Sequence, residues 1–267
     1  QRSAAGTGVA SLMELVDSHC HLDAGEFDHD RADVSARARA AGVMQQILPA
    51  ITAASWPGLR ALCCQTPGLY PAYGLHPLFL DQHRPTHLEL LAEWIERERP
   101  CAIGECGLDF FVDGLDAQAQ RAYFNGQLQL AKRVNLPLIV HARRATEEVI
   151  ARIKAVGGLR GVVHSFAGSP EQAQQLWKLD FMIGLGGPLT YPRANRLRGL
   201  VTRLPLQQLL LETDAPDQPD ASIRSQRNEP ARLRTVLECV AQLRGEDPAH
   251  IAAQTTANAR TLFGLPR

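Results

Sequence analysis

Short apolar runs alternate with amphipathic segments along almost the whole chain, and this alternation predicts the fold. Eight runs have the length of β-strands, and segments with apolar residues three or four positions apart lie between them. The QLLL run at residues 208–211 is apolar without alternation, as expected for a parallel strand buried on both faces. The first predicted strand ends within residues 16–23, and the others lie at 43–50, 69–76, 101–109, 138–141, 161–164, 181–187 and 206–211.

Helices are predicted between these strands, and the alternation indicates a single α/β domain, a (β/α)₈ TIM barrel, over residues 13–267. An open doubly wound sheet is the alternative, but no G-x-G-x-x-G motif follows any strand. Residues 1–12 are expected to be a flexible leader or a cloning remnant, with Met13 as the natural start. The predicted helices cover 28–41, 53–65, 87–99, 116–134, 145–156, 169–179, 193–203, 229–244, 248–254 and 256–263.

The composition and charge of the chain argue against several classes of protein. The 267 residues are 45% hydrophobic and carry a formal net charge of zero, which argues against a generally basic protein that coats nucleic acid. A local cationic groove remains compatible with this balance. Six cysteines without a C-x-x-C pair indicate reduced thiols and a cytoplasmic location. No apolar run is long enough for a membrane span, and no heptad or repeat indicates an obligatory protein partner.

The predicted strands share a second feature, because most of them stop at a histidine or a carboxylate. Reactive groups of such barrels lie at the carboxyl ends of the strands. An ionisable group at the end of a buried strand is costly unless it is paired or bound to a metal. Imidazoles and carboxylates together are natural ligands of Zn²⁺ or Mn²⁺. The residues concerned are His19, His21, His76, Glu105, His141, His164, Glu212 and Asp214.

Five segments at these strand ends resemble the successive motifs of the TatD family of metal-dependent hydrolases and nucleases. They are DSHCHLD (17–23), AIGECGLDF (102–110), HARRA (141–145), HSFAG (164–168) and LLLETDAPD (209–217). The resemblance extends from about residue 15 to residue 262. Two further segments, IGLGGPLTYPRA (183–194) and QRNEPARL (226–233), look closer to the YjjV-like branch of the family.

The resemblance implies a TIM barrel with two divalent ions, Mg²⁺, Mn²⁺ or Zn²⁺, that activate a water and clamp the attacking and leaving oxygens. It also implies catalytic roles for Glu105, as the bridge between the ions, and for Asp214, as an acceptor of the water's proton. The implied ligands are His19, His21 and Asp214 for one ion, His141 and His164 for the other, and Glu105 for both.

Other residues are assigned to the surroundings of this centre. Glu212 has the strand parity of Asp214, which predicts either that it orients a histidine ligand or that it forms a structural ion pair. Asp17 has the parity of His19 and is expected behind the ligands in the same way. His76 is expected either to face the substrate or to pin its own loop through a hydrogen bond.

Two arginines are candidates for phosphate binding. Arg143 follows His141 by two residues and shares its parity, and the resemblance supports this role. Arg193 lies in the loop after the seventh strand, where barrels often bind phosphate. Phe110 or Tyr191 would be available to stack on a base, although an aromatic in such a position more often only packs its loop.

The resemblance implies a deoxyribonuclease that acts on single strands or 3′ ends, with DNA as its partner. A small-molecule amidohydrolase on the same scaffold is the first alternative. Many amidohydrolases use a carbamylated lysine as the bridge, whereas Glu105 fills that place here, which favours the nuclease-like branch. A metal-bound scaffold without catalysis is the second alternative.

Overall fold

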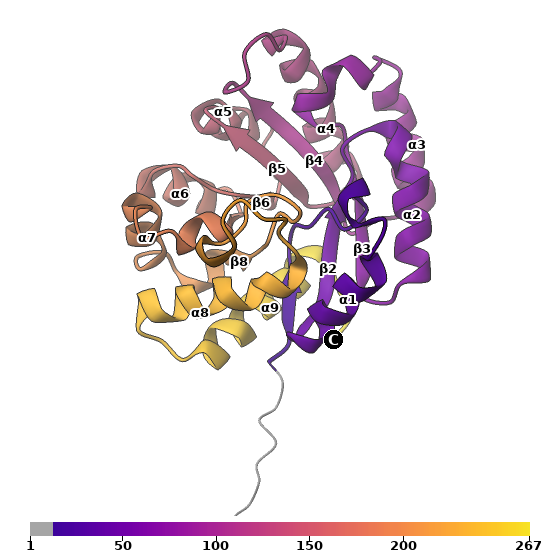
Figure 1. Cartoon of the computed structure of the whole chain (residues 1–267). Helices are drawn as coiled ribbons and strands as arrows, with labels where there is room; N and C mark the ends of the chain where they lie inside the picture. The colour runs from indigo at the N-terminus through magenta and orange to yellow at the C-terminus, as the bar shows by residue number, and fades with distance from the viewer. Residues whose placement is uncertain (1–12) are drawn as a thin grey trace, which may run out of the picture.

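The computed structural model describes residues 13–267 and has the predicted barrel architecture (Figure 1). Eight strands lie side by side in sequence order, and each neighbouring pair is parallel. Helices follow the strands and surround them as an outer layer. The predicted (β/α)₈ fold class is therefore confirmed. The leader expected at residues 1–12 lies outside the described residues.

The strands are short, and most of their residues are buried, which explains why the sequence shows continuous apolar runs. The longest strand is buried along its whole length. The strands are β1 (Leu15–Asp17), β2 (Val43–Pro49), β3 (Leu69–Tyr73), β4 (Ala102–Asp109), β5 (Leu138–Arg143), β6 (Gly161–Val163), β7 (Phe181–Leu185) and β8 (Leu209–Leu211).

The helices cover the outside of the strands. Within residues 13–267, no helix combines the length and the apolar character that crossing a lipid bilayer requires. The helices are α1 (Arg31–Ala40), α2 (Trp56–Gln65), α3 (His87–Glu98), α4 (Ala117–Val134), α5 (Thr146–Val156), α6 (Pro170–Trp177), α7 (Asn195–Val201), α8 (Leu233–Arg244) and α9 (Pro248–Phe263).

The end of the chain corrects one sequence expectation. Two helices are expected at 248–254 and 256–263, but α9 runs through both segments without a break. Thr255 and Thr256 have low helix propensity, yet both side chains are buried and bonded. The Thr255 hydroxyl donates to the Ile251 carbonyl at 2.8 Å, and the Thr256 hydroxyl donates to the Glu14 carbonyl at 2.9 Å. Tertiary packing therefore overrides the local preference.

The ends of several other elements also differ from the sequence expectations, for example those of α1 and β8. Helix α1 begins at Arg31 rather than at residue 28, after a 3₁₀ turn at Gly25–Phe27. Residues 206–208, expected to open the eighth strand, form a 3₁₀ turn before it. Differences of two or three residues at element ends are usual, because ends depend on contacts that periodicity does not contain.

The barrel closes between its last and first strands. The Ser18 N–H donates to the Leu211 carbonyl at 3.0 Å, and the Asp214 N–H donates to the His19 carbonyl at 2.9 Å. Next along the chain, the His21 N–H donates to the Ala215 carbonyl at 2.8 Å. These bonds join the extensions of β1 and β8, so that the His-x-His motif lies beside Asp214.

The core has two parts. The larger part fills the space between the strands and the outer helices. The smaller part lies inside the barrel, where nearly every strand contributes one side chain and the end of α9 contributes Leu262 and Phe263. The apolar end of α9 therefore packs against the barrel interior and leaves the carboxyl ends of the strands free for polar residues. The interior strand residues are Val16, Ile47, Ala72, Ala102, Ile139, Val162 and Leu210.

Helix α4 holds two strand ends through buried glutamines seven residues apart. Gln120 accepts from the Asp109 N–H at 2.8 Å and donates to the Asp109 carbonyl at 2.8 Å. Gln127 makes the same pair of bonds with Leu75, at 2.9 and 3.1 Å. Each side chain thus satisfies a backbone donor and acceptor that the sheet leaves free. Helix α4 thereby positions Asp109 and the neighbour of His76.

Gly107→Ala should destabilise the barrel strongly. Gly107 has a φ of +145°, and a Cβ built there would lie 2.0 Å from the backbone oxygen of His141. We expect the free energy of unfolding to fall by about 2 kcal/mol or more, because neither backbone can yield without breaking the β4–β5 pairing. Denaturant unfolding measures this change.

The matched control is Gly199→Ala in α7, where a Cβ meets no atom within 4 Å. That substitution should leave stability unchanged or raise it by roughly 0.5 kcal/mol, because alanine restricts the unfolded chain. Equal effects of the two substitutions would show that the close approach at Gly107 is not what excludes a side chain.

Candidate metal centre

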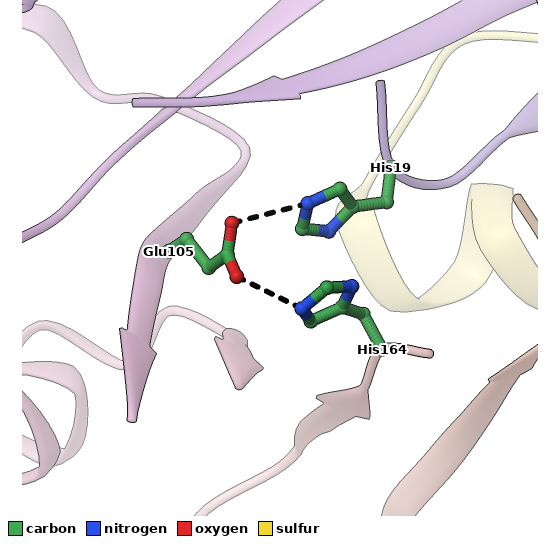
Figure 2. A group of neighbouring side chains, drawn as sticks. All are labelled: His19, Glu105 and His164. Carbon is green, nitrogen blue, oxygen red and sulfur yellow. Dashed lines mark ion pairs between the residues drawn. The ribbon is translucent and has the colours of Figure 1, made fainter. Parts of the chain in front are cut away.

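Glu105 is the centre of the polar cluster at the mouth of the barrel. It lies on β4, is 2% exposed, and points its two carboxylate oxygens in different directions (Figure 2). Oε2 lies 3.1 Å from Nε2 of His19, and Oε1 lies 2.8 Å from Nε2 of His164. Figure 2 shows the two imidazoles on one side of the carboxylate, each facing its own oxygen. One side chain thus joins two groups of histidines.

The first group gathers around Oε2 of Glu105. His21 Nε2 lies 3.5 Å from this oxygen and 3.1 Å from His19 Nε2. Oδ1 of Asp214 lies 3.4 Å from His19 Nε2 and 3.6 Å from His21 Nε2. Two ring nitrogens and two carboxylate oxygens from three different strand ends therefore converge within one small volume.

The second group gathers around Oε1 of Glu105. Nδ1 of His141 lies 3.2 Å from this oxygen, and it is also 3.3 Å from Nε2 of His164. His76 joins the same group, with Nε2 2.9 Å from Oε1. Nδ1 of His76 accepts from the Leu78 N–H, so the proton of the neutral ring lies on Nε2 and is donated to Glu105. His76 is thus both in contact with Glu105 and bonded to its own loop, and its role toward a substrate stays a prediction.

Burial and charge set the protonation of the cluster. Burial opposes a charge on His164 and on His21, but the Glu105 carboxylate outweighs it and raises the pKa of His164 to about 10 and that of His21 to about 9. Burial and the neighbouring His164 lower the pKa of His19 to about 4. Burial would raise the pKa of Glu105, yet the surrounding histidines hold it well below its usual value. Glu105 is therefore an anion among partly protonated imidazoles.

The donor set fits a divalent cation better than it fits hydrogen bonds alone. His19 and His21 face each other through Nε2 atoms, so at least one of the two nitrogens must be protonated in the absence of a cation. Nδ1 of His19 and Nδ1 of His164 have no hydrogen-bond partner among the described residues, although both are buried. Nitrogen and oxygen donors of this kind bind zinc or manganese, one group on each oxygen of Glu105.

Asp109 is a residue of this centre that the sequence reasoning missed. Its Oδ2 lies 2.8 Å from Nε2 of His141, while its Oδ1 accepts the N–H groups of Phe111 and Val112 at 2.9 and 3.2 Å. Asp109 therefore fixes the ring so that Nδ1 points at Glu105. The sequence does contain an indication of this role, because Asp109 lies four residues after Glu105 on the same strand and has its parity.

Asp17 and Glu212, which are expected around the ligands, bond to backbone and hydroxyl groups rather than to the imidazoles. Asp17 accepts from the Thr213 N–H and from its hydroxyl, and it joins the extension of β1 to that of β8. Glu212 accepts from the Ser165 N–H, and its Oε1 lies 3.8 Å from Nδ1 of His164, which is too far for a hydrogen bond. Burial raises the pKa of Asp17 to about 7 and that of Glu212 to about 8.

A second set of missed residues holds Asp214. Gln218 donates to Oδ2 of Asp214 and accepts from the Ser165 hydroxyl at 2.6 Å. Asn228 donates to the carbonyls of Thr213 and Gln218 and thereby braces the loop. Asp214 has a φ of +57°, which aspartate tolerates better than most residues do. No sequence spacing indicates these contacts, because they depend on the path of an irregular loop.

The predicted phosphate-binding arginines lie outside the ligand cluster. Arg143 is exposed at the end of β5, with its guanidinium carbon 3.6 Å from the ring centroid of Phe111. Arg193 is exposed in the loop before α7 and makes no salt bridge with any carboxylate of residues 13–267. Their roles toward a substrate stay predictions.

Metal binding at pH 7 should release protons. His21 and His164 have raised pKa values and are protonated at this pH without a metal, whereas an imidazole must lose its proton to become a ligand. We therefore expect the apparent affinity for Mn²⁺ or Zn²⁺ to rise from pH 6 to pH 8. Titration calorimetry in buffers of different ionisation enthalpy measures the protons released, and a binding heat that is the same in every buffer would contradict this.

Asp109→Asn should weaken metal binding without unfolding the chain. The amide cannot accept from both His141 and the loop N–H groups, so the ring loses its fixed orientation. We expect affinity to fall by roughly 10- to 100-fold, as for other residues that orient a ligand. Asp116→Asn, at the start of α4, is the control, because that side chain bonds only to the Gln118 and Ala119 N–H groups. Equal affinities of the two variants would contradict the role of Asp109.

Comparison with known proteins identifies the family of this chain. Residues 16–264 match the family model described as TatD related DNase. The chain is 40% identical over 259 residues to the uncharacterized metal-dependent hydrolase YjjV of Escherichia coli K12, which covers 96% of this chain and 100% of the relative. It is 35% identical over 258 residues to the 3′-5′ ssDNA/RNA exonuclease TatD of Klebsiella pneumoniae, with 94% and 98% covered.

A solved structure supports the same relationship. The crystal structure of YjjV from Escherichia coli K12, described as a TatD homolog, superimposes with a TM-score of 0.91 at 38% sequence identity. The match covers 96% of this chain and 100% of that one. The family match spans nearly the whole chain and includes every strand that contributes to the polar cluster. The chain belongs to the TatD family of metal-dependent hydrolases.

Proposed function

We propose that this protein is a metal-dependent phosphodiesterase that hydrolyses DNA from single-stranded or 3′ ends. The observation that carries the proposal is the position of Glu105, whose two oxygens face two separate groups of ligand atoms. A shared carboxylate of this kind suits a pair of divalent ions a few ångströms apart, which is a common arrangement for phosphoryl chemistry.

The residues of the site would serve as metal ligands and as a proton acceptor. His19, His21 and Asp214 would hold one ion and His141 and His164 the other, with Glu105 between them. Bound there, the ions supply an activated water and stabilise the charge that develops on the attacking and leaving oxygens. The Asp214 carboxylate would also accept the proton of the water, while the bond from Gln218 keeps it oriented.

The proposal for the substrate has its own support. Relatives about 35% identical to this chain are named 3′-5′ ssDNA/RNA exonucleases. Arg143 follows His141 on β5 and is exposed at the mouth, where a guanidinium could pair with a phosphate. Arg193 offers a second cation in the loop after β7. The proposed location is the cytoplasm, because all six cysteines are free thiols.

Hydrolysis of an end-labelled single-stranded oligodeoxynucleotide tests the function directly. Activity should require Mg²⁺, Mn²⁺ or Zn²⁺ and disappear in EDTA, with nucleotides released from the 3′ end. The same sequence as RNA and as a DNA duplex shows which nucleic acid is preferred. A panel of amide, lactone and ester substrates tests the amidohydrolase alternative, and metal binding without any hydrolysis would favour a scaffold.

Glu105→Ala should abolish turnover and weaken both ions. We expect the rate to fall by roughly 1000-fold or more, because metal stabilisation of the transition state is worth several kcal/mol. Metal content and circular dichroism separate this loss from unfolding. Glu238→Ala on α8 is the matched control, since that carboxylate is exposed and pairs only with Arg234. An unaffected rate in Glu105→Ala would remove the bridging role from the proposal.

A further inference from the structure

The loop between β4 and α4 exposes an aromatic side chain beside the metal centre. Phe111 is 42% exposed and Val112 is 40% exposed, and they are two of the few large apolar side chains at the surface of the described residues. The preceding residue, Phe110, is different, because it packs against the core below the Arg121 guanidinium. The aromatic that is presented to solvent is therefore Phe111 and not Phe110, which the sequence reasoning had named for stacking.

Phe111 is stacked with cations. The guanidinium carbon of Arg143 lies 3.6 Å from its ring centroid, and that of Arg144 lies 4.7 Å away. Neither arginine makes a salt bridge with a carboxylate of residues 13–267, whereas the neighbouring Arg121 and Arg152 both pair with Glu148. Two charges without a carboxylate partner therefore lie against an exposed ring, which is an arrangement that suits a planar, anionic ligand.

The position of this group relative to the metal centre is fixed by Asp109. One oxygen of Asp109 accepts the N–H groups of Phe111 and Val112, and the other contacts His141. The β4–β5 register places Asp109 opposite Arg143, two residues further along both strands than the pair of Gly107 and His141. The ring and its cations therefore lie next to a candidate metal ligand and are held by the same carboxylate.

We propose that Phe111, Arg143 and Arg144 form a platform on which one unpaired nucleobase of the substrate stacks while its phosphate chain enters the metal centre. This inference rests on the proposed function, because it names how the same site selects single strands. An aromatic ring with guanidinium groups binds bases through their flat faces without reading their sequence. In a duplex those faces are covered by neighbouring base pairs, so that only a single strand or a frayed end can use the platform.

The charges favour a nucleic acid over other occupants. A strand of DNA brings a phosphate with each base, so the two arginines gain pairing and the ring gains stacking at the same time. An uncharged apolar partner would leave both guanidinium groups without compensation, which is costly once water is displaced.

The kinetic test compares Phe111→Ala, Phe111→Trp and the wild-type protein with metal present. The substrates are a labelled thymidine oligonucleotide and an oligonucleotide of the same length whose 3′-terminal residues are abasic. For the base-containing strand, Phe111→Ala should raise KM by about 5- to 100-fold with little change in kcat, the loss expected for one stacked base. Phe111→Trp should restore KM to near the wild-type value, and the abasic strand should not distinguish the three proteins.

Trp177→Ala is the matched control, because Trp177 is an exposed aromatic on α6 outside the β4–α4 loop. It should leave KM unchanged for both strands. The proposal is overturned if Phe111→Ala has the wild-type KM on the base-containing strand, or if it raises KM equally on the abasic strand. The second result would mean that the loop supports phosphate binding alone.

A binding measurement separates this proposal from the proposed function. If the wild-type protein hydrolyses neither strand, the proposed function fails, but stacking can still be measured in EDTA. The thymidine oligonucleotide should quench the added fluorescence of Phe111→Trp, whereas the wild-type protein and the abasic strand should show little quenching. The absence of this difference overturns the platform, whether or not the protein is a nuclease.

Discussion

A buried carboxylate surrounded by imidazoles is the constraint on which the mouth of this barrel depends. Glu105 is almost wholly inaccessible, and such a charge is tolerated only where partners of opposite charge replace its lost hydration. Five histidines from the ends of four strands supply that compensation, some as protonated imidazoles and others as neutral N–H donors. Each of these strands must therefore end at the level of Glu105 along the barrel, with its histidine directed toward that carboxylate. The barrel is the architecture that allows parallel strand ends to converge in this way.

Buried polar side chains around the centre keep the strand ends in these positions. The strands of a barrel leave backbone groups free at their ends, and here buried side chains bond to several of them. Gln120 and Gln127 do so from α4, and Asp17 does so across the junction of β1 and β8. A buried polar group without a hydrogen-bond partner is costly, so these side chains are held in place by the backbone groups that they satisfy, and they restrict the positions of the ligands beside them.

Asp109 and Asp214 show how the centre and the surrounding loops are joined. Each uses one carboxylate oxygen toward the candidate ligands and the other toward a loop outside them. A displacement of either carboxylate therefore affects both the candidate ligands and the loop. A molecule that contacts the loop can displace the ligands in the same way. In a metal-dependent hydrolase this coupling is useful, because small displacements of reacting atoms cost large factors in rate.

The barrel and most of the polar cluster could be predicted from local patterns along the chain. Apolar runs of strand length are a local property, and the histidine or carboxylate at the end of most of these runs is visible without coordinates. The strand parity that links Glu105 with Asp109 was equally visible, although only Glu105 was recognised.

Contacts between the strands, and those of the loops, could not be predicted in this way. Several features depend on residues far apart in the chain or on irregular loops. They are the continuity of α9, the closing bonds between β8 and β1, the exposure of Phe111 rather than Phe110, and the contacts of Gln218 and Asn228. Periodicity describes which face of an element is apolar, but it contains no information about which distant group that face meets.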